Sequence, residues 1–351
     1  MKVCYVVHTP FQLLFATILM KKLNTFTTLL SLEDGRNRMD LQHPFIQENW
    51  ERYYFLDIRG LELQKKDYSI EKRNEICSIV DDFDFICLWS LHVPVNQIIM
   101  DNYKGIKKIY IFPEGLSTTV DYFRKSLHML IGKIEGRYNF DYFFTHIGKD
   151  LLKHPKVKEM PYLITDSNIN LLKLPDTNYF DFSRFDIILY SQPWSELKQI
   201  SIEQEQNFYQ RIFQMFPEKK ILVFLHPRDS ADKFNDFENI QVISNNHFPN
   251  EIYFKNCQPK LILSIASTIV INSAVMFPDV PHVLLFKLIN LKKIRNLIKP
   301  LQRFLKLFPN IFIPKCFNEI SEIANHPIAK KNILPSITEQ EFFQKYFKNN
   351  K

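Results

Sequence analysis

The sequence predicts an α/β protein with two domains, each built on a mainly parallel sheet, and three observations lead to this class. The chain has 351 residues, and a prior of about 150 residues per domain suggests two. Short β-rich runs alternate with longer amphipathic stretches, as in βαβ units. A polar segment at 166–186 interrupts this alternation, which then restarts. We therefore expect two Rossmann-like domains, over 1–170 and 180–351, facing each other across a cleft.

The first half contains five short β-rich runs. They predict strands at 2–7, 27–30, 85–88, 107–112 and 141–145. Helices are expected to begin near Pro10, near Ser69 and at Pro94. Proline is frequent in the first turn of a helix, because the amide that it lacks would have no partner there. The order is that of successive strand and helix units.

The second half repeats the pattern. Strands are expected at 187–190, 220–225, 240–243, 261–264 and 282–286, and helices at 195–216, 250–257 and 267–276. A basic helical tract at 288–308 and two further helices complete the chain. In such sheets, ligands bind beyond the carboxyl ends of the strands. Polar residues directly after a strand are therefore the candidates for function.

Composition limits the classes of partner. With 46% hydrophobic and 24% charged residues, the chain has the balance of a folded protein. The net charge of +7 favours acidic partners such as nucleotides, phosphorylated glycolipids or anionic membranes. The basic residues do not interleave with aromatics as in a nucleic-acid module, so no nucleic acid is expected.

Cysteine usage and the absence of leader segments indicate a compartment. The five cysteines have no Cys-x-x-Cys spacing, so neither a zinc site nor a disulfide framework is indicated. We find neither a signal peptide nor a membrane-spanning run. The sequence therefore predicts a cytoplasmic protein.

His226 is the strongest candidate in the second half. It directly follows the apolar run 221–225 and precedes Pro227 and Arg228. A histidine at the carboxyl end of a buried strand can donate a proton to a phosphate leaving group, since its unperturbed pKa is about 6.5. An ordinary His-Pro turn is the alternative. The three other His-Pro pairs in the chain do not follow a buried strand.

Phosphate binding in the second half requires groups other than glycine amides. All seven glycines precede residue 149, which excludes a glycine-rich phosphate loop there. Ser267 and Thr268 follow the strand 261–264 at the start of a helix, where hydroxyls and free amides point at one spot. The alternative, an ordinary Ser/Thr helix cap, is by itself the more frequent case.

In the first half, a carboxylate and two polar side chains follow strands. Glu114 comes after the strand 107–112 beside Gly115, where a carboxylate can take the proton from an attacking hydroxyl. Thr9 and Gln12 join the first strand to the first helix and could hold a polar acceptor. The alternatives are a plain turn at Glu114 and a helix cap at Thr9.

Two further acidic positions bear on donor and metal binding. Glu251 begins a helix, where a carboxylate suits the helix dipole and could also accept hydrogen bonds from a ribose. Asp82 and Asp84 have Asp-x-Asp spacing but precede their strand, so we expect a solvated turn there. We expect neither a metal nor another cofactor.

The ordered set of motifs resembles glycosyltransferase family 52, the bacterial lipooligosaccharide sialyltransferases and their relatives. The motifs that carry the resemblance begin at Thr9, Glu114, Ile188, His226, Glu251, Ser267 and Phe277. Acidic-Gly, His-Pro and paired-hydroxyl motifs also occur in other bacterial sialyltransferase and polysialyltransferase families.

The resemblance implies a GT-B architecture and inverting, metal-independent transfer of sialic acid from CMP-sialic acid to a galactose-terminated glycan of lipooligosaccharide or capsule. It implies that Glu114 is the general base, although many relatives carry a second acidic residue where Pro113 stands. It further implies that His226 stabilises or protonates the departing CMP. The remaining implied roles are phosphate binding by Ser267 and Thr268, ribose binding by Glu251, donor binding by Ser191, Gln192 and Arg228, and acceptor binding by Thr9 and Gln12.

Two alternatives and one surface stay open. The chain could use another nucleotide sugar, such as a UDP-hexose, or it could bind glycan or nucleotide without catalysis. The tract 288–308 carries apolar residues at helical spacing among lysines and arginines. Such a helix can lie on an anionic membrane, where lipid-linked acceptors are assembled, or it can pack on the core with a solvated basic face.

Overall fold

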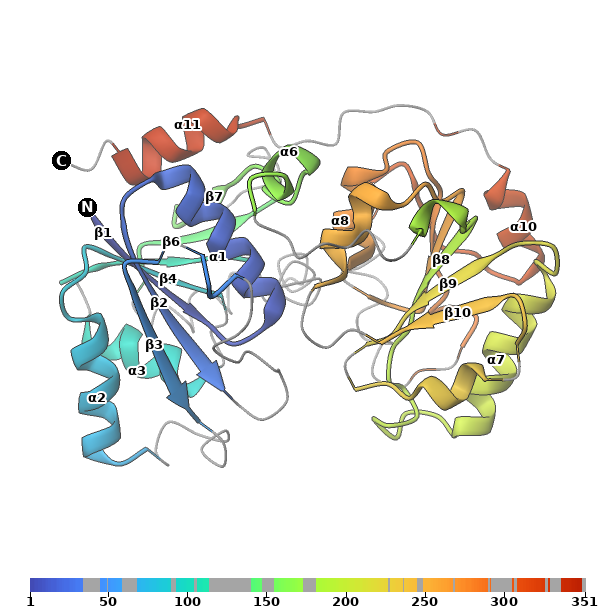
Figure 1. Ribbon diagram of the computed structural model, residues 1–351, viewed down its shortest axis with the longest axis horizontal. Helices are drawn as coiled ribbons and strands as arrows, with labels where there is room; N and C mark the ends of the chain where they lie inside the picture. Colours follow the sequence, from blue (N-terminus) through green and yellow to red (C-terminus); the bar gives the residue numbers. More distant parts are fainter. Residues whose placement is uncertain are drawn as a thin grey trace. The chain divides into compact units, whose positions relative to one another are not determined.

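The computed structural model divides the chain into two compact α/β units (Figure 1). The first comprises 1–175 and 334–351, and the second comprises 176–333. The structure describes residues 1–33, 45–48, 50–58, 68–89, 93–103, 106–113, 140–146, 155–172, 181–226, 228–235, 237–244, 249–267, 269–289, 291, 305, 308–325, 328 and 336–348.

The first unit contains a parallel sheet in the order β3-β2-β1-β4-β5-β6-β7. Its strands are β1 (Lys2–Val7), β2 (Phe26–Glu33), β3 (Arg52–Asp57), β4 (Phe85–Leu88), β5 (Lys108–Ile111), β6 (Tyr142–Thr145) and β7 (Val157–Glu159). The order reverses direction between β1 and β4, as it does in doubly wound folds. Such folds bind ligands beyond the carboxyl ends of the strands at this point, which here are β1 and β4.

Helices cover both faces of this sheet (Figure 1). They are α1 (Pro10–Leu23), α2 (Ile70–Val80), α3 (Pro94–Asn102), α6 (Asp166–Ile169), α11 (Glu339–Phe343) and the π-helical turn η6 (Gln344–Lys348). Alternate strand residues point to opposite faces. Cys4 and Val6 thus share a core with α2 and α3, whereas Tyr110 packs on Phe347 with ring centroids 5.3 Å apart.

The second unit repeats this topology in a parallel sheet of order β10-β9-β8-β11-β12-β13. Its strands are β8 (Ile187–Tyr190), β9 (Ile221–Phe224), β10 (Ile240–Ile243), β11 (Leu261–Ser264), β12 (His282–Leu284) and β13 (Ile311–Phe312). Its helices are η3 (Phe182–Arg184), α7 (Ile202–Gln214), η4 (Ala231–Phe234), η5 (Asn250–Asn256), α8 (Ile269–Met276) and α10 (Asn318–Ala324). Here the order reverses between β8 and β11.

The predicted fold class, two Rossmann-like domains with parallel sheets, is confirmed. Every strand predicted from the sequence is present, and the structure adds β3, β7 and β13. Each of these three strands lies at the edge of a sheet and has a neighbouring strand on one side only. An edge strand can therefore have a less hydrophobic sequence than a central strand. In β3, for example, Arg52 and Phe55 are exposed.

One helix start and one helix type differ from the prediction. Helix α7 begins at Ile202 and not at 195, because Ser201 and Gln204 form a reciprocal capping box that fixes the start. The segment expected to be helical at 250–257 is the 3-10 helix η5. Of the tract 288–308, the structure describes only 288, 289, 291, 305 and 308, so the expected basic helix lies outside the described residues.

The C-terminal segment packs on the first unit, although the sequence placed everything to 351 in the second domain. The Tyr110 hydroxyl donates to the Tyr346 carbonyl at 2.7 Å. The Phe342 ring packs edge-on against Phe144, with centroids 5.0 Å apart. An amphipathic helix reveals an apolar face in its sequence but not which sheet that face covers. None of the described helices is long and apolar enough to cross a membrane.

Candidate functional site

The candidate site lies at the carboxyl edge of the second sheet, where the strand order reverses. Three neighbouring strands end there: β8 before Ser191, β9 before Leu225 and β11 at Ser264. Parallel strands bring their carboxyl ends to one edge of the sheet. Residues about 35 and 75 positions apart in the sequence therefore become neighbours.

Ser191 and His226 are joined directly at this edge. Ser191 is buried, and its hydroxyl accepts a hydrogen bond from the His226 amide at 3.1 Å. The Ser191 amide in turn donates to the Phe224 carbonyl at 3.0 Å. The structure thus brings together two residues that the sequence selected separately, and Ser191 holds the backbone of the histidine.

The His226 ring has a defined tautomer. Its Nδ1 accepts a hydrogen bond from the Arg228 amide at 3.1 Å, so a neutral ring carries its proton on Nε2. Burial, with a smaller contribution from the Arg228 charge, lowers the pKa of His226 to about 4. At neutral pH the ring is therefore uncharged and offers one Nε2–H donor.

This finding changes the chemistry expected of His226. The sequence suggested an imidazole with a pKa of about 6.5 that could give up a proton near neutral pH. In the folded chain without ligand, the ring lacks that proton at pH 7 because burial disfavours the charged form. What it can supply directly is a hydrogen bond to an anion.

Ser264 links β11 to the start of α8. Its hydroxyl donates to the Tyr190 carbonyl at 3.1 Å and accepts from the Ser267 amide at 3.2 Å. Ser264 is completely buried, and Ser267 is half-buried just before α8. The turn that carries Ser267 is thus fastened to the end of β8. Thr268 lies outside the described residues.

Glu251 is held inside the second unit. Its Oε1 accepts a hydrogen bond from the Asn272 side chain on α8 at 3.0 Å. Burial raises the pKa of Glu251, and its charge acts on Tyr190 at the end of β8. Burial disfavours the charged form of this carboxyl group, and a protonated carboxyl group can donate as well as accept a hydrogen bond.

Gln192 and Arg228 complete the expected donor-side residues. Gln192 is half-buried, and its Oε1 has no hydrogen-bond partner among the described residues. Arg228 is exposed in the turn after His226. Gln192 directly follows Ser191 in the sequence, and Arg228 lies two residues after His226.

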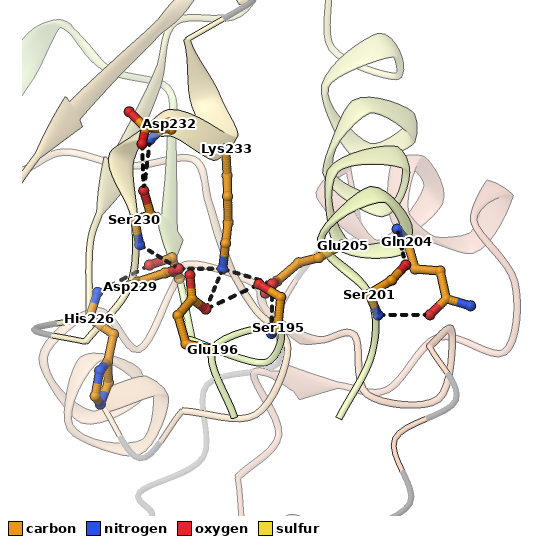
Figure 2. Close-up of polar contacts among 11 residues, drawn as sticks. Ser195, Glu196, Ser201, Gln204, Glu205, His226, Asp229, Ser230, Asp232 and Lys233 are labelled. Carbon is orange, nitrogen blue, oxygen red and sulfur yellow. Dashed lines mark hydrogen bonds and ion pairs between the residues drawn. The ribbon is translucent and has the colours of Figure 1, made fainter. Parts of the chain in front are cut away.

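Sequence inspection missed a buried charge cluster beside His226. Figure 2 shows the Lys233 ammonium between three carboxylates, Glu196 and Glu205 at 2.7 Å each and Asp229 at 2.5 Å. The Asp229 amide donates to the His226 carbonyl at 2.8 Å. The only hint in the sequence was the i, i+4 spacing of Asp229 and Lys233.

In the first unit, Thr9 and Gln12, the two candidates for acceptor binding, form hydrogen bonds with nearby backbone amides. Thr9 caps α1 by accepting from the Gln12 amide at 3.2 Å. The buried Gln12 side chain accepts from the His8 amide at 2.9 Å. Both side chains therefore support the turn between β1 and α1, and their role toward an acceptor stays a prediction. Glu114 lies outside the described residues.

The acidic pair expected to be a simple turn lies at the amino edge of the first sheet. Asp82 pairs with Lys2 at 3.5 Å, and Asp84 accepts from the Lys2 amide at 2.8 Å. In the described part of the chain, no group of three or more histidine, cysteine or acidic side chains is arranged to hold a metal ion.

Part of the chain matches a protein-family model. Residues 118–287 match the model of the family described as alpha-2,8-polysialyltransferase. The matched segment includes all the donor-side candidates of the second unit, from Ser191 to Thr268. It excludes Thr9, Gln12 and Glu114. No curated protein sequence matches the chain.

Solved structures resemble the whole chain. UDP-GlcNAc 2-epimerase from Methanocaldococcus jannaschii is 13% identical, with a TM-score of 0.64 over 98% of this chain and 99% of that one. An alpha/beta-galactoside alpha-2,3-sialyltransferase from Photobacterium phosphoreum is 11% identical, with a TM-score of 0.55 over 91% of this chain and 99% of that one. At these identities the likeness concerns the fold, which is GT-B-like.

The family comparison also refines the expected resemblance. A sialyltransferase family matches, and it is the polysialyltransferase family. The finer expectation, glycosyltransferase family 52, gains no separate support. The two kinds of family share acidic-Gly, His-Pro and paired-hydroxyl motifs, and these short motifs alone do not separate them.

Proposed function

We propose that this chain is an enzyme of the polysialyltransferase family, which transfers sialic acid from CMP-sialic acid to a glycan acceptor that already ends in sialic acid. The observation that carries the proposal is the family match over residues 118–287, which spans the carboxyl-edge site of the second unit. The family's description names an α-2,8 linkage, which joins one sialic acid to another. A capsule polysaccharide would be such a product.

The second unit would bind the donor. An uncharged Nε2–H on His226 can donate to a phosphate oxygen of the CMP leaving group, since donors placed where charge develops stabilise the transition state. Ser267 and Thr268 would add hydroxyls and free amides at the start of α8. Glu251 would bind the ribose, and Ser191, Gln192 and Arg228 would complete the donor site.

The reaction needs a base and a leaving-group donor. We assign the base to Glu114 on the family resemblance alone, with Thr9 and Gln12 on the acceptor side. The oxygen of the acceptor hydroxyl bonds to the anomeric carbon of the sialic acid, and its proton passes to the base. The bond between that carbon and the CMP phosphate oxygen breaks, and the phosphate takes the negative charge. Because the phosphate already leaves readily, a metal ion is not required in this scheme.

The decisive experiment compares donors and acceptors. CMP-sialic acid and UDP-GlcNAc are each offered with a labelled α-2,8-linked oligosialic acid or with a labelled galactose-terminated glycan, in the presence of a chelator. We expect elongation of the oligosialic acid with CMP-sialic acid only, and no effect of the chelator. Transfer only to the galactose-terminated glycan would contradict the acceptor assignment.

A second set of outcomes separates the alternatives. Turnover of UDP-GlcNAc would favour another nucleotide-sugar enzyme, in line with the fold shared with the epimerases. Binding of CMP-sialic acid without turnover in the parent, unchanged in Glu114→Gln, would indicate a binding protein. Loss of transfer on addition of the chelator would contradict the metal-independent scheme.

A further inference from the structure

The buried charge cluster beside His226 contains more negative than positive charge. One ammonium, that of Lys233, contacts three carboxylates: those of Glu196, Glu205 and Asp229. The side chains of Lys233, Glu205 and Asp229 are fully buried, and that of Glu196 is 31% exposed. Buried charges without a partner are strongly unfavourable, so a single cation stabilises all three carboxylates.

The cluster ties together four segments of the second unit. Glu196 lies in the turns after β8, Glu205 on α7, Asp229 in the turn after β9, and Lys233 on η4. Figure 2 shows these four side chains meeting at the Lys233 ammonium. Without the ammonium, only like charges would meet at this point.

The cluster is joined to the histidine through the backbone. The Asp229 amide donates to the His226 carbonyl at 2.8 Å, which closes the turn that carries the ring. The Asp229 side chain is in turn fixed by Lys233 at 2.5 Å. The position of the His226 ring therefore depends on a contact that the ring itself does not make.

The cluster is also coupled to His226 electrostatically. Two charged side chains shift the pKa of the ring: Arg228 lowers it, and Glu196 raises it. Because Lys233 contacts Glu196 at 2.7 Å, its positive charge counteracts the field of that carboxylate. The other two carboxylates, those of Glu205 and Asp229, contact the same Lys233 ammonium.

We propose that Lys233 is a positioning residue for the donor site, which fixes the 226–229 turn and offsets three carboxylates so that His226 presents an uncharged Nε2–H to a phosphate. That the ligand is a phosphate rests on the proposed function, whereas the effect of Lys233 on His226 does not. Lys233 itself touches no substrate in this scheme.

The proposal predicts that two substitutions shift the pKa of His226 in opposite directions. Lys233→Met removes the positive charge, so the uncompensated carboxylates raise the pKa of His226 above about 4, toward its ordinary value. Glu196→Gln removes a negative charge and lowers the same pKa further. Loss of structure exposes the ring and moves its pKa only toward the ordinary value, so the downward shift identifies an electrostatic effect.

The experiment follows the His226 imidazole by NMR during a pH titration of the full chain. It compares the parent with Lys233→Met, Glu196→Gln and the double variant Lys233→Met/Glu205→Gln. Lys260→Met is the matched control, because it removes an exposed ion pair with Asp186 at the amino edge of the same sheet. We expect the pKa of His226 to rise in Lys233→Met and to fall in Glu196→Gln. In the double variant it should return part of the way to the parent value, and in Lys260→Met it should not change. Thermal unfolding of each variant checks that it is folded.

Binding of CMP to the same proteins, measured by calorimetry, tests the consequence for the site. A displaced donor group weakens binding, and we expect the Kd of CMP to rise about tenfold or more in Lys233→Met and to stay unchanged in Lys260→Met. Unchanged His226 titration in both Lys233→Met and Glu196→Gln overturns the proposal. If Lys233→Met does not fold, Glu196→Gln decides alone.

The two proposals can fail separately. If the parent does not bind CMP but the pKa of His226 shifts as expected, the proposed function is wrong and the positioning role of Lys233 stands. If CMP binds equally to the parent and to a folded Lys233→Met, the positioning role is wrong and the proposed donor site is unaffected.

Discussion

His226 occupies a position where its surroundings decide which hydrogen bonds it can make. The Arg228 amide uses Nδ1 as an acceptor, and burial keeps the ring uncharged at neutral pH. The remaining ring atom, Nε2, is a donor. A neutral donor favours the anionic leaving group without needing a proton from solvent, and this distinguishes the site from one that relies on an imidazolium.

Substitution of His226 tests the donor role. We expect His226→Ala to lower kcat by about 10²–10³-fold, as the loss of a hydrogen bond to developing negative charge does. His226→Gln keeps an N–H donor and should lose less. Initial rates of CMP release measure both variants. Rates within twofold of the parent for His226→Ala would exclude His226 from the reaction.

The pH dependence tests the charge state of the ring. Since the pKa of His226 is about 4, its protonation state does not change between pH 5.5 and 7.5. The ratio of kcat/KM between the parent and His226→Gln should therefore stay constant over that interval. A ratio that changes with a midpoint near pH 6.5 would mean that the ring titrates like an exposed histidine.

At the level of elements, each strand end delivers one part of the site, and hydrogen bonds between the ends fix their spacing. Ser191 after β8 holds the His226 backbone, and Ser264 at the end of β11 holds both Tyr190 and Ser267. The hydroxyls of Ser191 and Ser264 form hydrogen bonds with backbone groups. The polar groups left for a ligand lie further along the same turns.

Replacement of Ser191 tests this division of labour. Ser191→Ala leaves the His226 amide without its partner, and a buried amide without a hydrogen bond costs about 1–3 kcal/mol. We expect a loss of that size in the free energy of unfolding, together with a lower kcat. Ser183→Ala, at an exposed position of η3, serves as the control. Equal stability of the two variants would mean that the Ser191 contact is dispensable.

The C-terminal segment is an element whose place follows from packing and not from chain order. Phe342 is fully buried against the first unit. We expect Phe342→Ala to lower the free energy of unfolding by about 3–5 kcal/mol, as large truncations in a core do. Leu171→Ala, at a position that is 48% exposed, is the control. Urea denaturation compares the two, and a difference below about 1 kcal/mol would contradict the packing.

For the whole molecule, buried histidines make stability depend on pH. His282 is fully buried, and burial lowers its pKa to about 4. Between about pH 6.5 and 4, the unfolded chain binds a proton that the folded chain does not, so stability falls as the pH falls. The expected slope is at most about 1.4 kcal/mol per pH unit. His282→Gln should reduce the slope of unfolding free energy against pH, and equal slopes would contradict this origin.

The sequence predicts the two sheets and the strand ends of the second unit, because an apolar run followed by polar residues is a local signal. His226 and Ser267 follow from that signal, whereas Ser191 enters only through the family resemblance. The partners of Lys233 were not, because they come from four segments and only the folded chain brings them together. For the same reason the C-terminal segment was assigned to the wrong unit: its apolar face does not specify which sheet it covers.

The proposed function requires the donor nucleotide to bind at the carboxyl edge of the second sheet. Hydrogen exchange followed by mass spectrometry, with and without saturating CMP, tests it directly. We predict slower exchange in peptides that contain Ser191, His226 and Ser267, and no change at the amino edge of that sheet around Lys260. Protection that is confined to the first unit, or that falls at the amino edge, would contradict the claim.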